Sequence, residues 1–293
     1  MKGLDAHGRF LWGLCYRMTD AADADELVQE TYARELESKP SRDLPVEPWL
    51  TQVALNLARD RLRQRKREAY VGPWLPSPVE VDAPSAPSPA ARYEQLESVG
   101  LGFLLALEAL TPNQRAVLLL RDVFDHSVAD TARALELTES TVKTTHHRAR
   151  KLIEAYDKRR IPFTPQLQQR TRAALESFFG AIVSGDTAAL TQLLRADVTE
   201  LSDGAGQYFA ARVPLIGRDR VVLFNQRLIQ IRGIPATFEV RIVNGLPAFL
   251  VTFAHSAHSE PPRALIAGSI DPTGQIASLF TVVADRKLSH LHF

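Results

Sequence analysis

The sequence has one cysteine, Cys15, and lacks any apolar run of the roughly 18 residues that a membrane-spanning helix needs. A single cysteine excludes an internal disulfide and is typical of a reducing compartment, and its helical apolar surroundings predict a thiol packed in a core. The N-terminus is broken by charges and has no A-x-A-like cleavage site, so we expect no signal peptide and a cytoplasmic protein.

Metal-ligand spacing is absent as well. The adjacent histidines His146 and His147 would point about 100° apart on a helix, and no cysteine or carboxylate spacing completes a site. We therefore expect no metal and no cofactor.

Net charge is nearly absent, because 35 lysines and arginines oppose 34 aspartates and glutamates. The basic residues are nevertheless clustered, in "RDRLRQRKR" at 59–67 and in "HHRARK" at 146–151. Clusters of this kind predict contacts with phosphate groups. The length of 293 residues and the hydrophobic content of 45% predict about two globular domains, and three small ones would also fit.

Helical apolar spacing covers the first 67 residues and predicts a small all-α bundle whose third helix lies at 46–67. A linker rich in proline, alanine and serine follows at 69–92, and its start contains "VGPWLPSP", a tryptophan among three prolines. Such a composition cannot bury enough apolar area to fold alone, so Trp74 needs a partner elsewhere in the chain.

The stretch after the linker carries clear helix start signals. Thr111, Pro112 and Gln114 have the arrangement of a capping box with proline at the first helical position, and Ser127 begins a second box. Two helices at about 127–136 and 138–155, separated by a tight turn, have the outline of a helix-turn-helix.

On the longer of these two helices, Val142, Ala149 and Ile153 would face the bundle, and polar residues would share the open side. Arginine and lysine there can approach phosphates or guanine edges, and the shorter polar groups can hydrogen-bond to either. The open-side residues are Ser140, Lys143, Thr144, His147, Arg148 and Lys151. The alternative is a surface helix whose charges only face solvent.

From residue 166 the pattern is two helices, at 166–184 and in "TAALTQLL", and then a run of strands beyond 197. Examples of these strands are 237–243, 247–254 and 277–284. This order predicts an α+β domain after two all-α modules, and thus a multidomain protein.

The first half, about residues 5–155, resembles the sigma-70 family of bacterial RNA polymerase specificity subunits, in the extracytoplasmic-function class that keeps only regions 2 and 4. "DADELVQETYARELE" (23–37) and "PWLTQVALNLARDRLRQRKR" (48–67) resemble region 2, and "LEALTPNQRAVLLLRDVFDHSVADTARALELTESTVKTTHHRARKLI" (107–153) resembles region 4. The resemblance implies region 2 at 1–68, the linker at 69–92 and region 4 at 93–158.

By that resemblance, one acidic helix face would dock on the polymerase clamp, a second helix would lie near the minus-ten element, and the basic helix would enter the major groove at the minus-thirty-five element. The polymerase-binding residues would be Asp25, Glu26, Gln29 and Glu30. The minus-ten residues would be Trp49, Asn56, Arg59 and Arg63. A core position is the alternative for Trp49. One departure is Glu136, which stands where many region 4 turns have glycine, so we expect the turn to persist at some cost in stability.

Residues 167–293 resemble a SnoaL-like domain, a cone of curved sheet and helices around a pocket, most closely in "LESFFGAIVSGDTAALTQLLRADVTELSDGAG". In some members of that family the pocket is an enzyme site with a carboxylate or histidine as proton acceptor, and Asp203, His255 and His258 are the candidates here. We favour structural roles for them, because Asp203 lies in a turn composition and the histidines fall at a strand end. The chain is therefore interpreted as non-enzymatic.

One subclass of these sigma factors, the SigJ type with a fused SnoaL-like domain, carries the motifs WLPEP, DGGGK and NPDKL. Here the linker has "WLPSP" at 74–78, and the domain has "DGAGQ" at 203–207 and "ADRKL" at 284–288, which we call the two domain motifs. Ser77 replaces an acid and Gln207 a lysine, so we expect the interface to depend more on Trp74, Leu75 and the prolines than on that charged pair. The predicted interdomain residues are Trp74, Leu75, Pro76, Asp203, Gly204, Gly206, Lys287 and Leu288. Packing of Trp74 on the preceding helix is the alternative.

Together these patterns predict a sigma factor that binds the clamp and flap regions of RNA polymerase core, directs it to promoter DNA and is regulated by its own C-terminal domain. We expect neither a membrane contact nor a separate anti-sigma factor. The alternative function is a DNA-binding module fused to a small-molecule enzyme or a ligand sensor.

Overall fold

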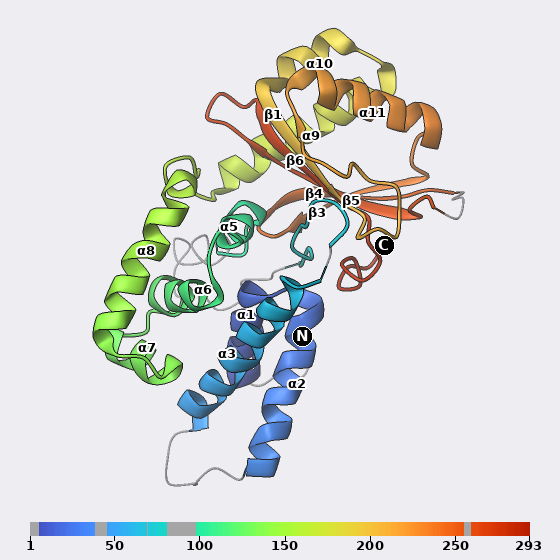
Figure 1. The fold of residues 1–293 in the computed structure, drawn as a ribbon. Coiled ribbons are helices and arrows are strands. Elements are labelled where there is room, and N and C mark those ends of the chain that lie inside the picture. The colour runs from blue at the N-terminus through green and yellow to red at the C-terminus, as the bar shows by residue number, and fades with distance from the viewer. Residues whose placement is uncertain (1–5, 39–45, 69, 81–97, 255–258) are drawn as a thin grey trace. The chain divides into compact units, whose positions relative to one another are not determined.

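The computed structural model describes residues 6–38, 46–68, 70–80, 98–254 and 259–293 (Figure 1). Its contacts divide the chain into two compact units. The helical unit comprises Met1–Ala69 and Gly102–Arg160, and the C-terminal unit comprises Tyr70–Leu101 and Ile161–Phe293. The connecting segment is Tyr70–Leu101, which ends nine residues beyond the predicted linker of 69–92, and from here on it is called the linker. It belongs to the C-terminal unit, although it joins the two parts of the helical unit.

The helical unit is all-α, as predicted. Its elements are α1 (Ala6–Met18), α2 (Ala21–Ser38), α3 (Val46–Arg65), α5 (Leu101–Leu107), α6 (Pro112–Leu118), the π-helical turn η1 (Leu119–Val123), α7 (Val128–Leu135) and α8 (Glu139–Asp157). Cys15 is fully buried in α1, and burial raises the pKa of its thiol to about 12, so the predicted core thiol is confirmed. None of the described helices combines the length and apolar composition needed to cross a lipid bilayer.

The predicted helix starts are confirmed. The Thr111 hydroxyl accepts a hydrogen bond from the Gln114 N–H, and the Gln114 side chain accepts one from the Thr111 N–H, which completes the capping box of α6. Ser127 accepts from the Asp130 N–H at the start of α7. At the end of α7, Glu136 has φ 54° and ψ 44°, the left-handed conformation. A glutamate thus adopts the turn that glycine adopts freely, at a cost of about 1 kcal/mol or more.

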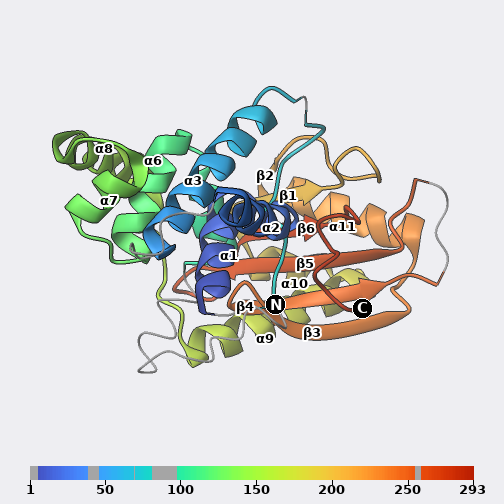
Figure 2. The same cartoon turned by 90° about the horizontal axis from the view of Figure 1, so that it is seen from below.

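The C-terminal unit is an α+β domain, as predicted. Its elements are α9 (Pro165–Ser184), α10 (Thr187–Leu193), β1 (Leu194–Asp203), β2 (Leu215–Ile216), α11 (Arg218–Arg232), β3 (Thr237–Val243), β4 (Leu246–Thr252), β5 (Arg263–Ile270) and β6 (Ile276–Val282). The strands form one sheet in the order β2-β1-β6-β5-β4-β3, in which only the β1–β6 pair is parallel. Figure 1 shows the three helices on one face of this sheet, and Figure 2 shows the strands in front of α9 and α10.

The run of strands beyond residue 197 is interrupted by α11, which the sequence analysis did not predict. This segment is rich in the β-branched residues valine and isoleucine, which favour strands. Val221, Val222, Asn225 and Ile229 nevertheless recur at helical spacing, and Gly217 and Gly233 bound the helix. The side of this segment that carries Val221 is buried against the sheet. This tertiary packing makes the segment helical, because it outweighs a weak local preference for a strand.

Candidate functional site

The outward face of α8 carries the six residues predicted to contact the minus-thirty-five element. Val142, Ala149 and Ile153 are buried, so α8 packs on the helical unit with its other face. The six polar residues are all exposed: Ser140, Lys143, Thr144, His147, Arg148 and Lys151. This face presents hydrogen-bond donors and three positive charges, the chemistry that base edges and phosphates accept.

Two other members of the same basic cluster have a structural role. His146 Nε2 lies 2.8 Å from one carboxylate oxygen of Asp122, and Arg150 Nε lies 2.9 Å from the other. Since Asp122 belongs to η1, these contacts fix α8 to the element that precedes the helix-turn-helix. The adjacent histidines therefore differ: His146 is half-buried against Asp122, and His147 is exposed.

The four residues predicted at the minus-ten element recur along one side of α3 and differ in their exposure. Trp49 is half-buried and Arg63 is exposed. Arg59 donates to Asn56 and, at 3.1 Å from Nη1, to the Asn113 side chain at the start of α6. Burial lowers the pKa of Arg59. The polar groups of Asn56 and Arg59 are thus engaged where α3 meets α6.

Ion pairs and hydrogen bonds join α3 to the later helices of the same unit. Glu108 accepts from Arg65 of α3 and from Arg115 of α6, each at 2.6 Å. Burial alone would raise the pKa of Glu108, but the two positive charges and their hydrogen bonds lower it overall. A further bond of 2.7 Å runs from Gln52 Nε2 to Glu136 Oε1. The two helical modules are held together by these contacts.

The residues predicted to bind polymerase lie on the exposed side of α2. These are Asp25, Glu26, Gln29 and Glu30. Asp25 accepts a hydrogen bond of 2.7 Å from Trp12 Nε1, and Glu26 lies 2.8 Å from Arg61 Nη2. The acidic face is therefore partly neutralised within the helical unit, and a basic partner would compete with Arg61 for Glu26.

In the C-terminal unit, the fully buried carboxylate of Asp203 holds the linker. Its Oδ2 accepts from the Leu75 N–H at 2.7 Å and its Oδ1 accepts from the Tyr70 hydroxyl at 2.6 Å. Lys287 Nζ lies 2.8 Å from Oδ2 and also donates to the Leu75 carbonyl oxygen. One buried ion pair thus binds both backbone polar groups of Leu75. We call this arrangement of Tyr70, Trp74, Leu75, Asp203 and Lys287 the clasp.

Aromatic and apolar groups complete the clasp. Lys287 Nζ lies 4.3 Å from the centroid of the Trp74 ring and 5.2 Å from that of Tyr70, within the range of cation–π attraction. Leu75 of the linker and Leu288 of the second domain motif are fully buried, and Pro76 is buried beside Leu75 in the sequence. Trp74 therefore has its partner in Lys287 of the C-terminal unit.

Sheet topology explains why the two domain motifs meet. Because β1 and β6 are parallel and Asp203 stands opposite Val282, both strands end at the same edge of the sheet. The turn after Asp203 needs glycine twice: a Cβ at Gly204 would lie 2.6 Å from the Tyr208 carbonyl oxygen, and Gly206 has φ +73°. Asp203 Oδ1 also accepts from the Ala205 N–H, the turn contact that its sequence predicted.

A second attachment joins two points of the linker, Val79 and Val99, at Asn244. This residue stands in the β3–β4 turn with φ 51°. Its Oδ1 accepts from the Val79 N–H at 3.2 Å, and its own N–H donates to the Val79 carbonyl oxygen at 2.9 Å. Its Nδ2 donates to the Val99 carbonyl oxygen at 2.7 Å. Residues 79 and 99 are therefore held at one point.

The clasp contains a charged pair, although Ser77 and Gln207 stand where the related motifs have charges. Ser77 is fully buried. Gln207 Nε2 donates to Asp285 at 2.6 Å, and the same carboxylate accepts from Tyr208 at 2.7 Å. Gln207 thus bonds within the domain, and the buried pair of Asp203 and Lys287 supplies the charge at the linker.

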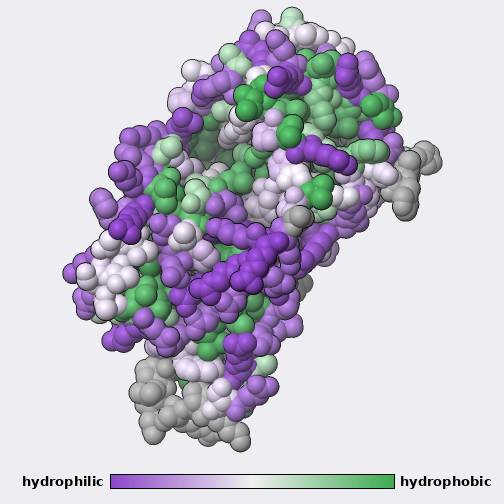
Figure 3. All heavy atoms as spheres, in the orientation of Figure 1, coloured by the Kyte–Doolittle hydropathy of each residue, from purple (hydrophilic) through white to green (hydrophobic). Residues whose placement is uncertain are grey.

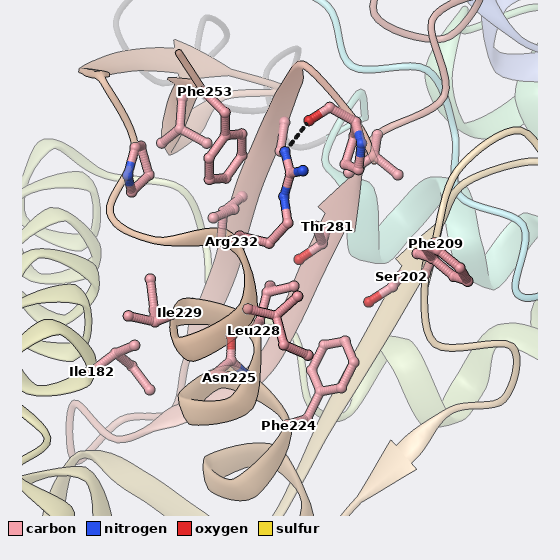
Figure 4. A pocket seen from close by; sticks show the side chains of 18 of the residues that line it. Ile182, Ser202, Phe209, Phe224, Asn225, Leu228, Ile229, Arg232, Phe253 and Thr281 are labelled. Carbon is pink, nitrogen blue, oxygen red and sulfur yellow. Dashed lines mark hydrogen bonds between the residues drawn. The ribbon is translucent and has the colours of Figure 1, made fainter. Parts of the chain in front are cut away.

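The C-terminal unit also contains a cavity of about 500 Å³ between α9, α11 and the sheet (Figure 4). Of the proposed proton acceptors, Asp203 is not one of its lining residues and faces the linker, while His255 and His258 lie outside the described residues. Two carboxylates stand in its wall, Glu200 and Glu260, and the sequence analysis missed both. The burial of Glu200 could have been predicted, because Glu200 follows the buried Val198 by two residues on β1 and therefore lies on the same face of the strand.

Two family models match the chain: "Sigma-70 region 2" over residues 4–68 and "Sigma-70, region 4" over residues 101–153. The chain is 32% identical over 247 residues to the ECF RNA polymerase sigma factor SigJ of Mycobacterium tuberculosis, covering 82% of this chain and 77% of that one. It is 30% identical over 237 residues to the ECF sigma factor SigG of the same species, covering 71% of this chain and 62% of SigG, less than two thirds of the latter.

The similarity extends to three dimensions. The crystal structure of the Mycobacterium tuberculosis extracytoplasmic function sigma factor SigJ matches with a TM-score of 0.75 and 26% identity, covering 97% of this chain and 96% of that one. Both modules and the C-terminal domain are therefore shared with one solved protein.

Proposed function

This chain belongs to the extracytoplasmic-function class of RNA polymerase sigma factors, and from that premise we propose that its C-terminal unit restrains its two DNA-binding modules through the linker. A sigma factor directs RNA polymerase core to promoters. The observation that carries the proposal is the buried Asp203 carboxylate, which binds the main chain of the segment that joins the modules.

The number of linker residues that are free to extend determines how far apart the two modules can move. The linker, Tyr70–Leu101, has 32 residues. If free, it could reach at most roughly 110 Å, with an average span of about 30 Å. With residues 79 and 99 both bound to Asn244, only residues 70–79 and 99–101 contribute to the span, ten and three residues, which limits it to roughly 40 Å. The attachment therefore limits how far the two modules can separate.

The proposed DNA contacts require that separation. We assign the exposed face of α8 to the minus-thirty-five element, the polar residues of α3 to the minus-ten element and the acidic face of α2 to the polymerase core. Arg59 bonds to Asn113 of α6 in this structure, so this contact between α3 and α6 must break before Arg59 can turn to a base or phosphate, and separation of the modules breaks it. Holding the linker thus opposes promoter binding, and a regulator built into the chain takes the place of a separate anti-sigma factor.

The test is in vitro transcription with the host's polymerase core and the full-length chain, on fragmented genomic DNA with the products sequenced, so that no promoter need be known. Asp203→Asn removes one charge of a buried pair and leaves Lys287 unpaired, a change that typically costs 3–5 kcal/mol. We expect output from the promoters used by the wild type to rise severalfold. Asp285→Asn is the matched control, because that carboxylate bonds to Gln207 and Tyr208 but not to the linker. Equal output from Asp203→Asn and the wild type would refute the restraint.

A further inference from the structure

The cavity of the C-terminal unit is mainly apolar and opens beside exposed apolar side chains. Its volume of about 500 Å³ lies in the range of small-molecule sites. The walls include Phe178, Phe249 and Ile266 from α9, β4 and β5. Of the residues that line it, Phe209 and Ile231 are 75% and 74% exposed. Figure 3 shows hydrophobic surface gathered over this region around α11.

A few polar groups interrupt the apolar walls on one side. Glu200 and Ser202 lie two residues apart on β1 and therefore project from the same face of the strand. Thr281 stands opposite Ser202 in the β1–β6 ladder, and both line the cavity (Figure 4). Glu200 Oε2 accepts from Asn225 Nδ2 of α11 at 2.7 Å.

One of these groups lacks a partner. Ser202 is 2% exposed, and its hydroxyl has no hydrogen-bond partner among the described residues. A buried hydroxyl without a partner costs about 1–3 kcal/mol, and a ligand that bonds to it recovers that loss. An apolar cavity with an unpaired hydroxyl in its wall therefore has the features of a ligand site.

We propose that this cavity binds an uncharged, largely apolar molecule that carries a hydroxyl group, and that its binding strengthens the clasp. The hydroxyl of the ligand bonds to Ser202, and its apolar body fills the space between α11 and the sheet. The effect of the ligand on the clasp rests on the proposed function, whereas the binding of the ligand in the cavity does not.

The buried carboxyl of Glu200 indicates that the ligand is not an anion. Burial raises the pKa of this carboxyl to about 7, so its charged form is already costly without a second negative charge nearby. An anionic ligand would add repulsion and its own desolvation. Two arginines of α11 line the cavity as well. The guanidinium of Arg232 pairs with Glu260 and donates to the Pro261 carbonyl oxygen at 2.6 Å, and Arg227 is exposed to solvent, which screens its attraction for an anion.

The link to the clasp is the shared wall of two cavities. A smaller cavity of about 50 Å³ is lined by Val71 and Gly72 of the linker together with Ser202, Phe209 and Ala210. These last three residues also line the ligand cavity. Because Ser202, Phe209 and Ala210 line both cavities, a ligand that bonds to Ser202 orders the wall that Val71 and Gly72 of the linker share, and so favours the conformation that holds the linker.

Binding is tested on the full-length chain with naphthol as the probe, followed by its own fluorescence. Naphthalene, naphthoate and naphthylmethylammonium serve as competitors of the same size. We expect one naphthol per chain and about fivefold weaker binding of naphthalene, the value of one net hydrogen bond. No saturable binding of naphthol, or tighter binding of either charged probe, would overturn the proposal.

Variants locate the probe. Ser202→Ala should weaken naphthol about fivefold and leave naphthalene unchanged, whereas Ala264→Phe should fill the cavity and abolish both. Ser278→Ala is the matched control, since it removes a hydroxyl from the same sheet outside the cavity wall. Naphthol binding that is indifferent to both Ser202→Ala and Ala264→Phe would contradict the site.

The coupling has its own measurement. Saturating naphthol should slow hydrogen exchange of the Leu75 amide severalfold, and Lys287→Met should weaken naphthol by the same factor, because coupling is reciprocal. Unchanged exchange at Leu75 would overturn the coupling. The transcription test with Asp203→Asn needs no ligand, so failure of the ligand site and failure of the clasp are separable.

Discussion

The buried Glu200 predicts a pH dependence that is specific to the C-terminal unit. In the unfolded chain the carboxyl has its ordinary pKa of 4.5, and in the folded chain burial raises it to about 7. The raised pKa contributes stability that is fully present below about pH 4.5 and is lost as the pH rises through 7. The loss amounts to roughly 3 kcal/mol, of which about 2 kcal/mol falls between pH 5.5 and 8.5.

Glu200→Gln isolates this contribution. Glutamine keeps the oxygen that accepts from Asn225 and does not titrate, so the other titrating groups cancel in the comparison. We expect the free energy of unfolding of the variant, relative to that of the wild type, to increase by about 2 kcal/mol as the pH rises from 5.5 to 8.5. The assay is urea unfolding of the full-length chain, read by hydrogen exchange at the amides of β1 and β6, because these strands report the C-terminal unit alone.

Glu239→Gln is the matched control, since Glu239 lies at the surface of β3 and pairs with Arg241. Its difference from the wild type should stay flat over the same pH range. A flat difference for Glu200→Gln as well, or a loss of stability at pH 8.5, would refute the argument from burial.

Two further predictions concern the linker and the DNA face. Asn244→Gly keeps the left-handed turn but removes the side chain that binds Val79 and Val99, so hydrogen exchange of the Val79 amide should accelerate at least tenfold. Glu80→Ala is the control. It removes only a surface partner of Arg241 and should leave this exchange unchanged. Lys143→Ala should weaken binding of duplex DNA and lower its salt slope by about one, whereas Lys158→Ala, whose charge pairs with Glu154 at the end of α8, should not; equal slopes for the two variants would contradict the assigned face.

Local signals account for the parts of the fold that were predictable from sequence. The capping box at Thr111 and the strand at 237–243 are each encoded within a few residues, and the structure reproduces both. The helix α11 was missed because its β-branched residues favour a strand locally, and only packing against the sheet makes it helical.

The clasp was only partly predictable. Motif resemblance indicated that Trp74 and Leu75 meet the two domain motifs, but not which atoms bind. The pairing of Asp203 with Lys287 depends on the parallel contact of β1 with β6, which joins residues 84 positions apart in the chain. Asn244 gave no signal as a linker site, because "NG" between two strands predicts only a hairpin turn.

Because the C-terminal unit and the linker belong to the same chain, a weak contact between them is enough for regulation. A segment tethered to its binding site has an effective concentration near 1 mM, so a contact with a dissociation constant of about 0.1 mM is already closed roughly nine-tenths of the time. A ligand that shifts this balance by 1–3 kcal/mol changes the closed-to-open ratio by about 5- to 150-fold. On β1 the two sites occupy opposite faces, with Glu200 and Ser202 toward the cavity and Asp203 toward the linker. A small displacement at the end of this one strand therefore acts on both sites, and no longer path through the domain is needed.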